Sequence, residues 1–156
     1  HQQRVAQLMS QPNTLAAQRR KARHFGLQAL YQWTLSDASL VDIDAEFRVD
    51  NDFRHTDGEY FQALLRGVME DVESLEALFS PLLDRALDDL DPIERNLLRM
   101  GTFELKERID VPYKVVINEA VSLAKKFGAT ESHRYINGIL DKVASELRTV
   151  ERAKED

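Results

Sequence analysis

Apolar residues recur at steps of three and four along most of this chain, and this spacing gathers them on one face of successive α-helices. The pattern is strongest in residues 60–79, where it persists for about five turns. It also marks residues 22–33 and 136–150. The one strand-like run, at residues 115–117, lies inside an amphipathic segment and is therefore predicted to be helical. The sequence thus predicts an all-α protein.

Capping residues divide this pattern into separate helices. Asp91 is an N-cap carboxylate and Pro92 occupies the first helical position, so a helix is predicted from residue 92 to about residue 108. The other expected caps are Thr56 before the 60–79 helix, Pro112 and a left-handed Gly128 around the next-to-last helix, and Thr130 before the last one. A short helical turn is expected at residues 82–87.

About seven helical segments with short connections predict a helical bundle whose neighbouring helices run antiparallel. We expect one domain at residues 19–150, built from two three-helix subdomains at about 19–80 and 81–150. Residues 1–18 are expected to form an N-terminal extension that is partly disordered. Residues 151–156 are expected to be a frayed tail.

Charge is distributed unevenly along the chain. The net charge is −6, and residues 37–59, with eight acids and two bases, carry the whole of it. A basic run, Arg19-Arg20-Lys21-Ala22-Arg23, precedes this acidic segment. Because the opposite charges are segregated, a local cationic surface can exist on an acidic protein.

No motif for catalysis or cofactor binding stands out. The absence of cysteine excludes disulfides, thiolate metal sites and a cysteine nucleophile. The six glycines are isolated, so there is no phosphate-binding loop, and no histidine belongs to the Glu-x-x-His pattern of di-iron bundles. No apolar run approaches the roughly 20 residues that a membrane helix needs. We therefore expect a cytoplasmic protein that is not an enzyme, with no cofactor, metal site or membrane partner.

The basic run has two interpretations. It can be a solvated helix face that aids solubility. Alternatively, Arg19, Arg20 and Arg23 lie on neighbouring rows of a helix, at offsets of three and four, and can present donors to one polyanion. Guanidinium groups match phosphate and stack on bases, which suits single-stranded RNA.

Several ordered segments carry a family pattern. The basic run leads into Leu27-Gln28-Ala29-Leu30-Tyr31-Gln32-Trp33. The later segments are Tyr60 through Gly67-Val68, Glu94 with Leu98-Arg99, Glu104-Leu105, Asp110-Val111-Pro112-Tyr113-Lys114-Val115, Ile117-Asn118-Glu119-Ala120, Leu123-Ala124-Lys125, Phe127-Gly128 and Asn137-Gly138-Ile139-Leu140-Asp141. In this order they resemble the NusB family, whose first helix begins with an arginine-rich run of this kind. The resemblance spans residues 19–147 and implies a fold of two three-helix bundles.

The resemblance also implies a function. The family pairs with NusE, a ribosomal protein of the small subunit, and the pair binds single-stranded boxA RNA. With other Nus factors it forms an antitermination complex on RNA polymerase that promotes read-through in ribosomal RNA operons. We also consider a homodimer, which would bury the arginine-rich start until RNA or NusE released it.

Site residues follow by position in the family pattern. The resemblance places Arg19, Arg20, Lys21, Arg23, Glu131 and Tyr135 at the RNA, and Tyr31 and Glu94 at NusE. Tyr135 can stack on an unpaired base, or it can be a core aromatic beside Ile136. For Glu94, a capping role at the start of its helix is the alternative.

Two rival functions belong to other classes. The regulatory N-terminal part of some ribosomal RNA cytosine methyltransferases resembles the NusB family too, but no catalytic domain or nucleophilic cysteine follows in this sequence. A helical scaffold that binds only protein is the second rival. Salt-dependent binding of boxA RNA, but not of a scrambled sequence, would distinguish it from an RNA-binding protein.

Overall fold

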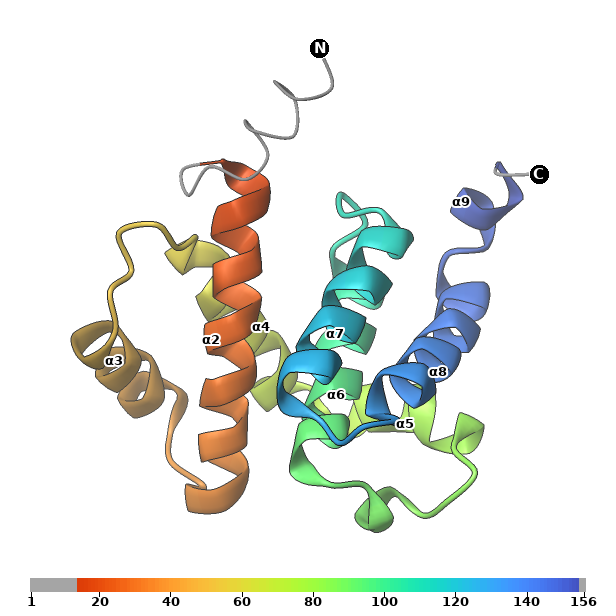
Figure 1. Ribbon diagram of the computed structural model, residues 1–156, viewed down its shortest axis with the longest axis horizontal. Helices are drawn as coiled ribbons and strands as arrows, with labels where there is room; N and C mark the ends of the chain where they lie inside the picture. Colours follow the sequence, from red (N-terminus) through yellow and green to blue (C-terminus); the bar gives the residue numbers. More distant parts are fainter. Residues whose placement is uncertain (1–13, 155–156) are drawn as a thin grey trace. The chain divides into compact units, whose positions relative to one another are not determined.

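The computed structural model describes residues 14–154, and every regular element in that range is helical (Figure 1). The α-helices are α2 (Leu15–Ser36), α3 (Leu40–Asp50), α4 (Gly58–Glu70), α5 (Val72–Phe79), α6 (Pro92–Glu107), α7 (Tyr113–Phe127), α8 (Ser132–Leu147) and α9 (Thr149–Ala153). Two short 3₁₀ helices, η1 (Ser80–Leu82) and η2 (Leu87–Asp89), lie between α5 and α6. The all-α prediction is confirmed. The N-terminal extension expected at residues 1–18 lies mostly outside the described residues.

The chain forms two compact units, which divide between Arg66 and Gly67. The sequence placed the division near residue 80 because it read residues 60–79 as one helix. In the structure the backbone leaves helical geometry at Asp71, with φ −128° and ψ 26°, and α5 starts anew at the next residue. Helix α5 then packs on α6 and α8, which makes it part of the second unit.

Aromatic rings fill the core of the first unit. The Phe25 and Phe53 rings stack with centroids 5.0 Å apart, and Phe61 meets Phe53 edge-on at the same centroid distance. Phe47 of α3 contacts Phe61 at 6.0 Å, which joins α3 to the start of α4. These rings fix the position of α2, because Phe25 is on its buried face.

Helix α6 is the centre of the second unit and contacts α5, α7 and α8. Its residues are buried from Asn96 to Leu105 without interruption. Two glycines allow close helix contacts: a Cβ at Gly101 would meet Leu140 Cδ1 at 2.7 Å, and one at Gly67 would overlap the Phe103 ring. This part of α6 therefore has no solvent-exposed face, and its polar residues, Asn96, Arg99, Thr102 and Glu104, are buried too.

Of the five expected caps, those at Asp91 and Pro112 are correct, since Pro112 directly precedes α7, and the other three are wrong in position or conformation. Asp91 Oδ1 accepts a hydrogen bond from the Glu94 amide at 2.8 Å, as expected for an N-cap. The cap of α4 is Asp57, which accepts from the Tyr60 amide at 3.0 Å, because this helix starts two residues later than Thr56. Gly128 has φ −89° and is not left-handed. Helix α8 starts at Ser132, so that Glu131 and not Thr130 occupies its N-cap position. Residues 82–87 do not form the expected helical turn.

The end of the chain is held in place by Arg148, whose side chain is 4% exposed. Its guanidinium donates to the carbonyl oxygens of Glu104 and Leu105 at 3.1 and 2.7 Å. Further bonds reach the carbonyls of Arg108 and Val111. These carbonyls lie at the end of α6 and in the turn that follows it. Those of Glu104 and Arg108 also accept from the backbone amides of Arg108 and Val111, so the guanidinium adds a second hydrogen bond to each of them. Fraying was expected from residue 151, but residues 149–153 form α9.

None of the helices within residues 14–154 is long and apolar enough to cross a bilayer.

Candidate nucleic-acid interface

Helix α2 starts before the basic run. Thr14 caps it, with its hydroxyl accepting from the Ala17 amide at 3.1 Å, and Leu15 is the first helical residue. The run at residues 19–23 therefore occupies the second and third turns and not the helix start. The partial positive charge of a helix N-terminus is confined to its first turn, so these cations must act through their own charge.

Two of the four cations turn back onto the first unit. The guanidinium carbon of Arg19 is 4.6 Å from the centroid of the Tyr60 ring, and its Nε is 3.7 Å from Asp57 Oδ2. Arg23 lies over the same ring at 5.3 Å and is only 4% exposed. Residues four apart share one row of a helix, and this row packs on the start of α4.

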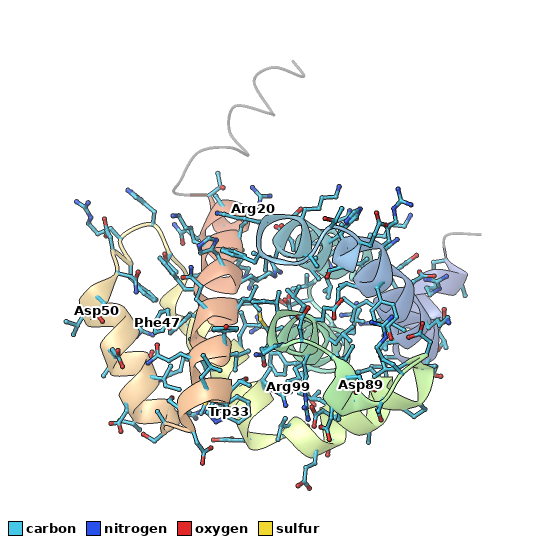
Figure 2. All side chains as sticks on the ribbon, turned by 60° about the horizontal axis from the view of Figure 1, so that its bottom comes forward. Arg20, Trp33, Phe47, Asp50, Asp89 and Arg99 are labelled. Atoms are coloured by element: carbon cyan, nitrogen blue, oxygen red, sulfur yellow. The ribbon has the colours of Figure 1, made fainter. Side chains whose placement is uncertain are left out.

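The other two cations face solvent. Arg20 and Lys21 are both exposed, and Figure 2 marks Arg20 on α2. Lys21 Nζ also lies 5.7 Å from the Phe25 ring centroid, at the long end of the cation–π range. The expectation that Arg19, Arg20 and Arg23 present donors to one polyanion is therefore corrected, because Arg23 belongs to the buried row.

Tyr135 of α8 is held by two residues of the connection between η1 and η2. Its hydroxyl donates to Asp84 Oδ1 at 3.0 Å, and the Arg85 guanidinium carbon is 4.3 Å from its ring centroid. Arg85 Nε also donates to Asp84 Oδ1, at 2.8 Å. The ring is half-buried, unlike the fully buried Ile136 next to it, so Tyr135 is not a core aromatic.

The Tyr135 phenol and the Asp84 carboxylate each keep one protonation state near neutral pH. Burial raises the pKa of the Tyr135 phenol, and its hydrogen bond to Asp84 raises it further. Hydrogen bonds from Arg85 and Tyr135 lower the pKa of Asp84. The phenol therefore remains a donor and the carboxylate an acceptor at neutral pH.

Glu131 lies one turn before Tyr135 and is exposed. Its Oε2 is 3.4 Å from Arg134 Nε, in an exposed pair on α8. A carboxylate in this position repels phosphate, but it can accept hydrogen bonds from the amino groups of bases. Glu131 and Tyr135 belong to the second unit, whereas the basic run belongs to the first.

The two residues expected at NusE have different environments. Tyr31 on α2 is 38% exposed. Glu94 is only 8% exposed, and its Oε2 accepts a hydrogen bond from the Ser132 hydroxyl at 2.9 Å. The carboxylate of Glu94 thus ties the start of α6 to the start of α8, a role that neither the partner contact nor the capping alternative anticipated.

Sequence reasoning missed Asp84, Arg85 and Ser132. Asp84 and Tyr135 are separated by 51 residues, and no periodicity or spacing within a helix reports such a contact. The signal that could have drawn notice to Arg85 is its isolation as the only base in the acid-rich segment 83–91. Among residues 14–154, no three histidine or carboxylate side chains come together as metal ligands would.

The chain is similar to known proteins of one family in sequence and in fold. Residues 20–145 match the profile of the NusB family. The transcription antitermination protein NusB of Hahella chejuensis is 55% identical over 135 residues, which cover 86% of this chain and 91% of the relative. The solved structure of T. maritima NusB aligns with a TM-score of 0.73 and 31% identity, covering 82% of this chain and 91% of that one. A crystal structure of the antitermination factors NusB and NusE with double-stranded RNA aligns with a TM-score of 0.67 over 82% of this chain and 96% of that one. Its identity of 24% supports the fold alone.

Proposed function

This chain belongs to the NusB family, and we propose that it is a transcription antitermination factor that binds boxA RNA together with NusE. The observation that carries the proposal is its identity of 55% with a transcription antitermination protein along 91% of that relative. We propose that it works in the cytoplasm by binding and not by catalysis. Other Nus factors on RNA polymerase would complete the complex.

The proposed RNA contacts begin with the exposed cations of α2. Arg20 and Lys21 would contact backbone phosphates, and Arg19, 21% exposed, would hold their turn of the helix against Tyr60. Two phosphate contacts to a single strand predict a slope of about −1.4 in the logarithm of affinity against the logarithm of salt concentration. From so few phosphate contacts we expect weak binding by this chain alone.

The second part of the proposed RNA contact is on α8. Tyr135 would stack on an unpaired base, which contributes roughly 1–3 kcal/mol, and Glu131 would accept from a base amino group. A stacking contact of this kind requires a single strand. The solved relative with NusE is described with double-stranded RNA. Comparing single-stranded boxA with a duplex of the same sequence therefore tests the proposed form of the ligand.

We propose that NusE contacts Tyr31, whose exposed ring can supply apolar area at low entropic cost. Glu94 is a weaker candidate, because its carboxylate is buried and bonded to Ser132. A homodimer that covers the basic run is also kept as a prediction. Sedimentation of the chain alone and with NusE would detect it.

The decisive experiment titrates labelled boxA RNA with the chain alone, with NusE alone and with both. The proposal expects weak binding by each protein, tight binding by the pair, and loss of the tight complex when boxA is scrambled. Equal affinity for boxA and scrambled RNA would reject sequence recognition. Binding of NusE without any RNA binding would favour the protein-only scaffold.

A further inference from the structure

The connection between α5 and α6 places one cation against α8. Arg85 is the only basic residue in segment 83–91, which also contains four aspartates. Its guanidinium carbon lies 4.3 Å from the centroid of the Tyr135 ring. Arginine stacks on aromatic rings in this way while its fork of donors stays available at the edge.

One carboxylate oxygen holds both partners of this stack. Asp84 Oδ1 accepts from Arg85 Nε at 2.8 Å and from the Tyr135 hydroxyl at 3.0 Å. Asp84 Oδ2 lies 3.5 Å from Arg85 Nη2, so the carboxylate faces the fork of the guanidinium. We call Asp84, Arg85 and Tyr135 the Tyr135 clasp. The two oxygens of Asp84 occupy the same donors that the unesterified oxygens of a phosphodiester would use.

The ion pair between Asp84 and Arg85 in the clasp is exposed enough for a ligand to replace Asp84. The side chain of Arg85 is 40% exposed and that of Asp84 is 68% exposed. An ion pair with this much solvent contact contributes little stability, so a phosphate can replace the carboxylate at small cost. The remaining acid near Arg85 is Glu94, whose Oε2 is hydrogen-bonded to Ser132. Asp88 is directed to Arg95, at 3.3 Å.

We propose that Arg85 is an RNA phosphate contact, and that Asp84 occupies its guanidinium in the RNA-free protein as a substitute for phosphate. When a base stacks on Tyr135, the adjoining phosphate takes the place of Asp84 at Arg85, and the carboxylate turns to solvent. Asp84 is thus an autoinhibitory contact. Arg85 provides a phosphate contact in addition to those of the α2 cations. This inference rests on the proposed function, since it adds a residue to the RNA contact proposed on α8.

The test compares two neutralised aspartates of one connection. Asp84→Asn removes the charge that competes with phosphate, whereas Asp89→Asn removes the same charge from an exposed side chain beyond the clasp, marked in Figure 2. With NusE present, Asp84→Asn should tighten boxA binding about two- to fivefold, the range expected for loss of an exposed ion pair. Asp89→Asn should have a smaller effect through general charge alone.

Arg85 variants complete the test. Arg85→Ala should weaken binding and flatten the salt slope by about 0.7, the value for one phosphate on a single strand. Arg85→Lys should keep the slope but recover only part of the affinity, because it lacks the fork. In the double variant Asp84→Asn/Arg85→Ala, the gain from Asp84→Asn should disappear. Circular dichroism and thermal melting would verify that each variant is folded.

Two results would overturn the inference while leaving the proposed function intact. One is an Asp84→Asn variant whose affinity for boxA is the same as that of Asp89→Asn, while the wild-type protein still binds boxA. The other is an unchanged affinity and salt slope in a folded Arg85→Ala variant. Failure of the wild-type protein to distinguish boxA from scrambled RNA, with NusE present, would instead reject the proposed function, and the inference with it.

Discussion

The guanidinium carbon of Arg23 lies 5.3 Å from the centroid of the Tyr60 ring, in a position that leaves Arg23 only 4% exposed. A run of four cations in the sequence is therefore not a surface of four cations in the structure. Arg23 belongs to the packing of the first unit, and Arg20 with Lys21 to its surface. Substitutions of Arg23 should therefore lower stability, whereas substitutions of Arg20 and Lys21 should weaken RNA binding.

Replacing Arg23 should affect folding first. Arg23→Ala removes a desolvated cation–π contact and is expected to lower the free energy of unfolding by about 2 kcal/mol. Arg20→Ala, on the exposed face of the same turn, should change it by less than about 0.5 kcal/mol. Urea denaturation of both variants measures the difference. Equal stability of the two variants would show that the Arg23 contact is unimportant.

Arg148 should be among the most sensitive positions in the second unit. Arg148→Ala would remove the donor to the Leu105 and Val111 carbonyl oxygens, and each buried acceptor left without a donor costs about 1–3 kcal/mol. We expect a loss of at least about 3 kcal/mol in the free energy of unfolding. Arg134→Ala is the control in the same unit, since Arg134 makes an exposed ion pair with Glu131 at 3.4 Å. A similar small loss for both arginines would contradict the role given to Arg148.

Stability should fall in acid through Glu76. Burial alone would raise the pKa of Glu76, but hydrogen bonds and charges from Arg95 and Arg99 outweigh it and lower the pKa below 4.5. A carboxyl group with a lowered pKa in the folded state stabilises the protein above its unfolded pKa, and this contribution is lost as the pH falls through the folded value. Glu76→Gln should therefore be less stable than wild type at pH 7, and the gap should narrow below pH 4.5. A gap that is independent of pH would contradict the ionic role.

Tyr31 and Glu94 should respond differently when they are changed. Tyr31→Ala is expected to weaken NusE binding with only a modest loss of stability, because the residue is 38% exposed. Glu94→Ala should cost about 1–3 kcal/mol of stability, since the buried Ser132 hydroxyl loses its acceptor. Calorimetric titration with NusE and thermal melting separate the two effects. If Glu94→Ala were as stable as wild type but bound NusE more weakly, Glu94 would be a partner contact after all.

The helices could be predicted from the sequence because their signals are local. The apolar period identifies α2 and α8, and Asp91 with Pro92 marks the start of α6 at the correct residue. The break at Asp71 was missed, since the apolar pattern continues across it. An apolar period indicates which residues face the core, but it does not indicate whether the helical backbone is continuous.

The candidate site was less predictable, because exposure of a charged residue depends on packing between helices. The register of α2 against Tyr60 decides that Arg23 is buried and Arg20 is not. Neither this register nor the contact of Tyr135 with Asp84 is set by neighbours in sequence. The family resemblance supplied positions, and the structure supplied their environments.

The most direct measurement is the salt dependence of boxA affinity, in the presence of NusE, for wild type, Arg20→Ala, Lys21→Ala and Arg54→Ala. Arg54 is the control, an exposed arginine paired with Asp52 in the connection between α3 and α4. Each of the two α2 substitutions should flatten the slope by about 0.7 and weaken binding, whereas Arg54→Ala should leave the slope unchanged. Wild-type slope and affinity in both α2 variants would contradict the claim that these two exposed cations bind the RNA backbone.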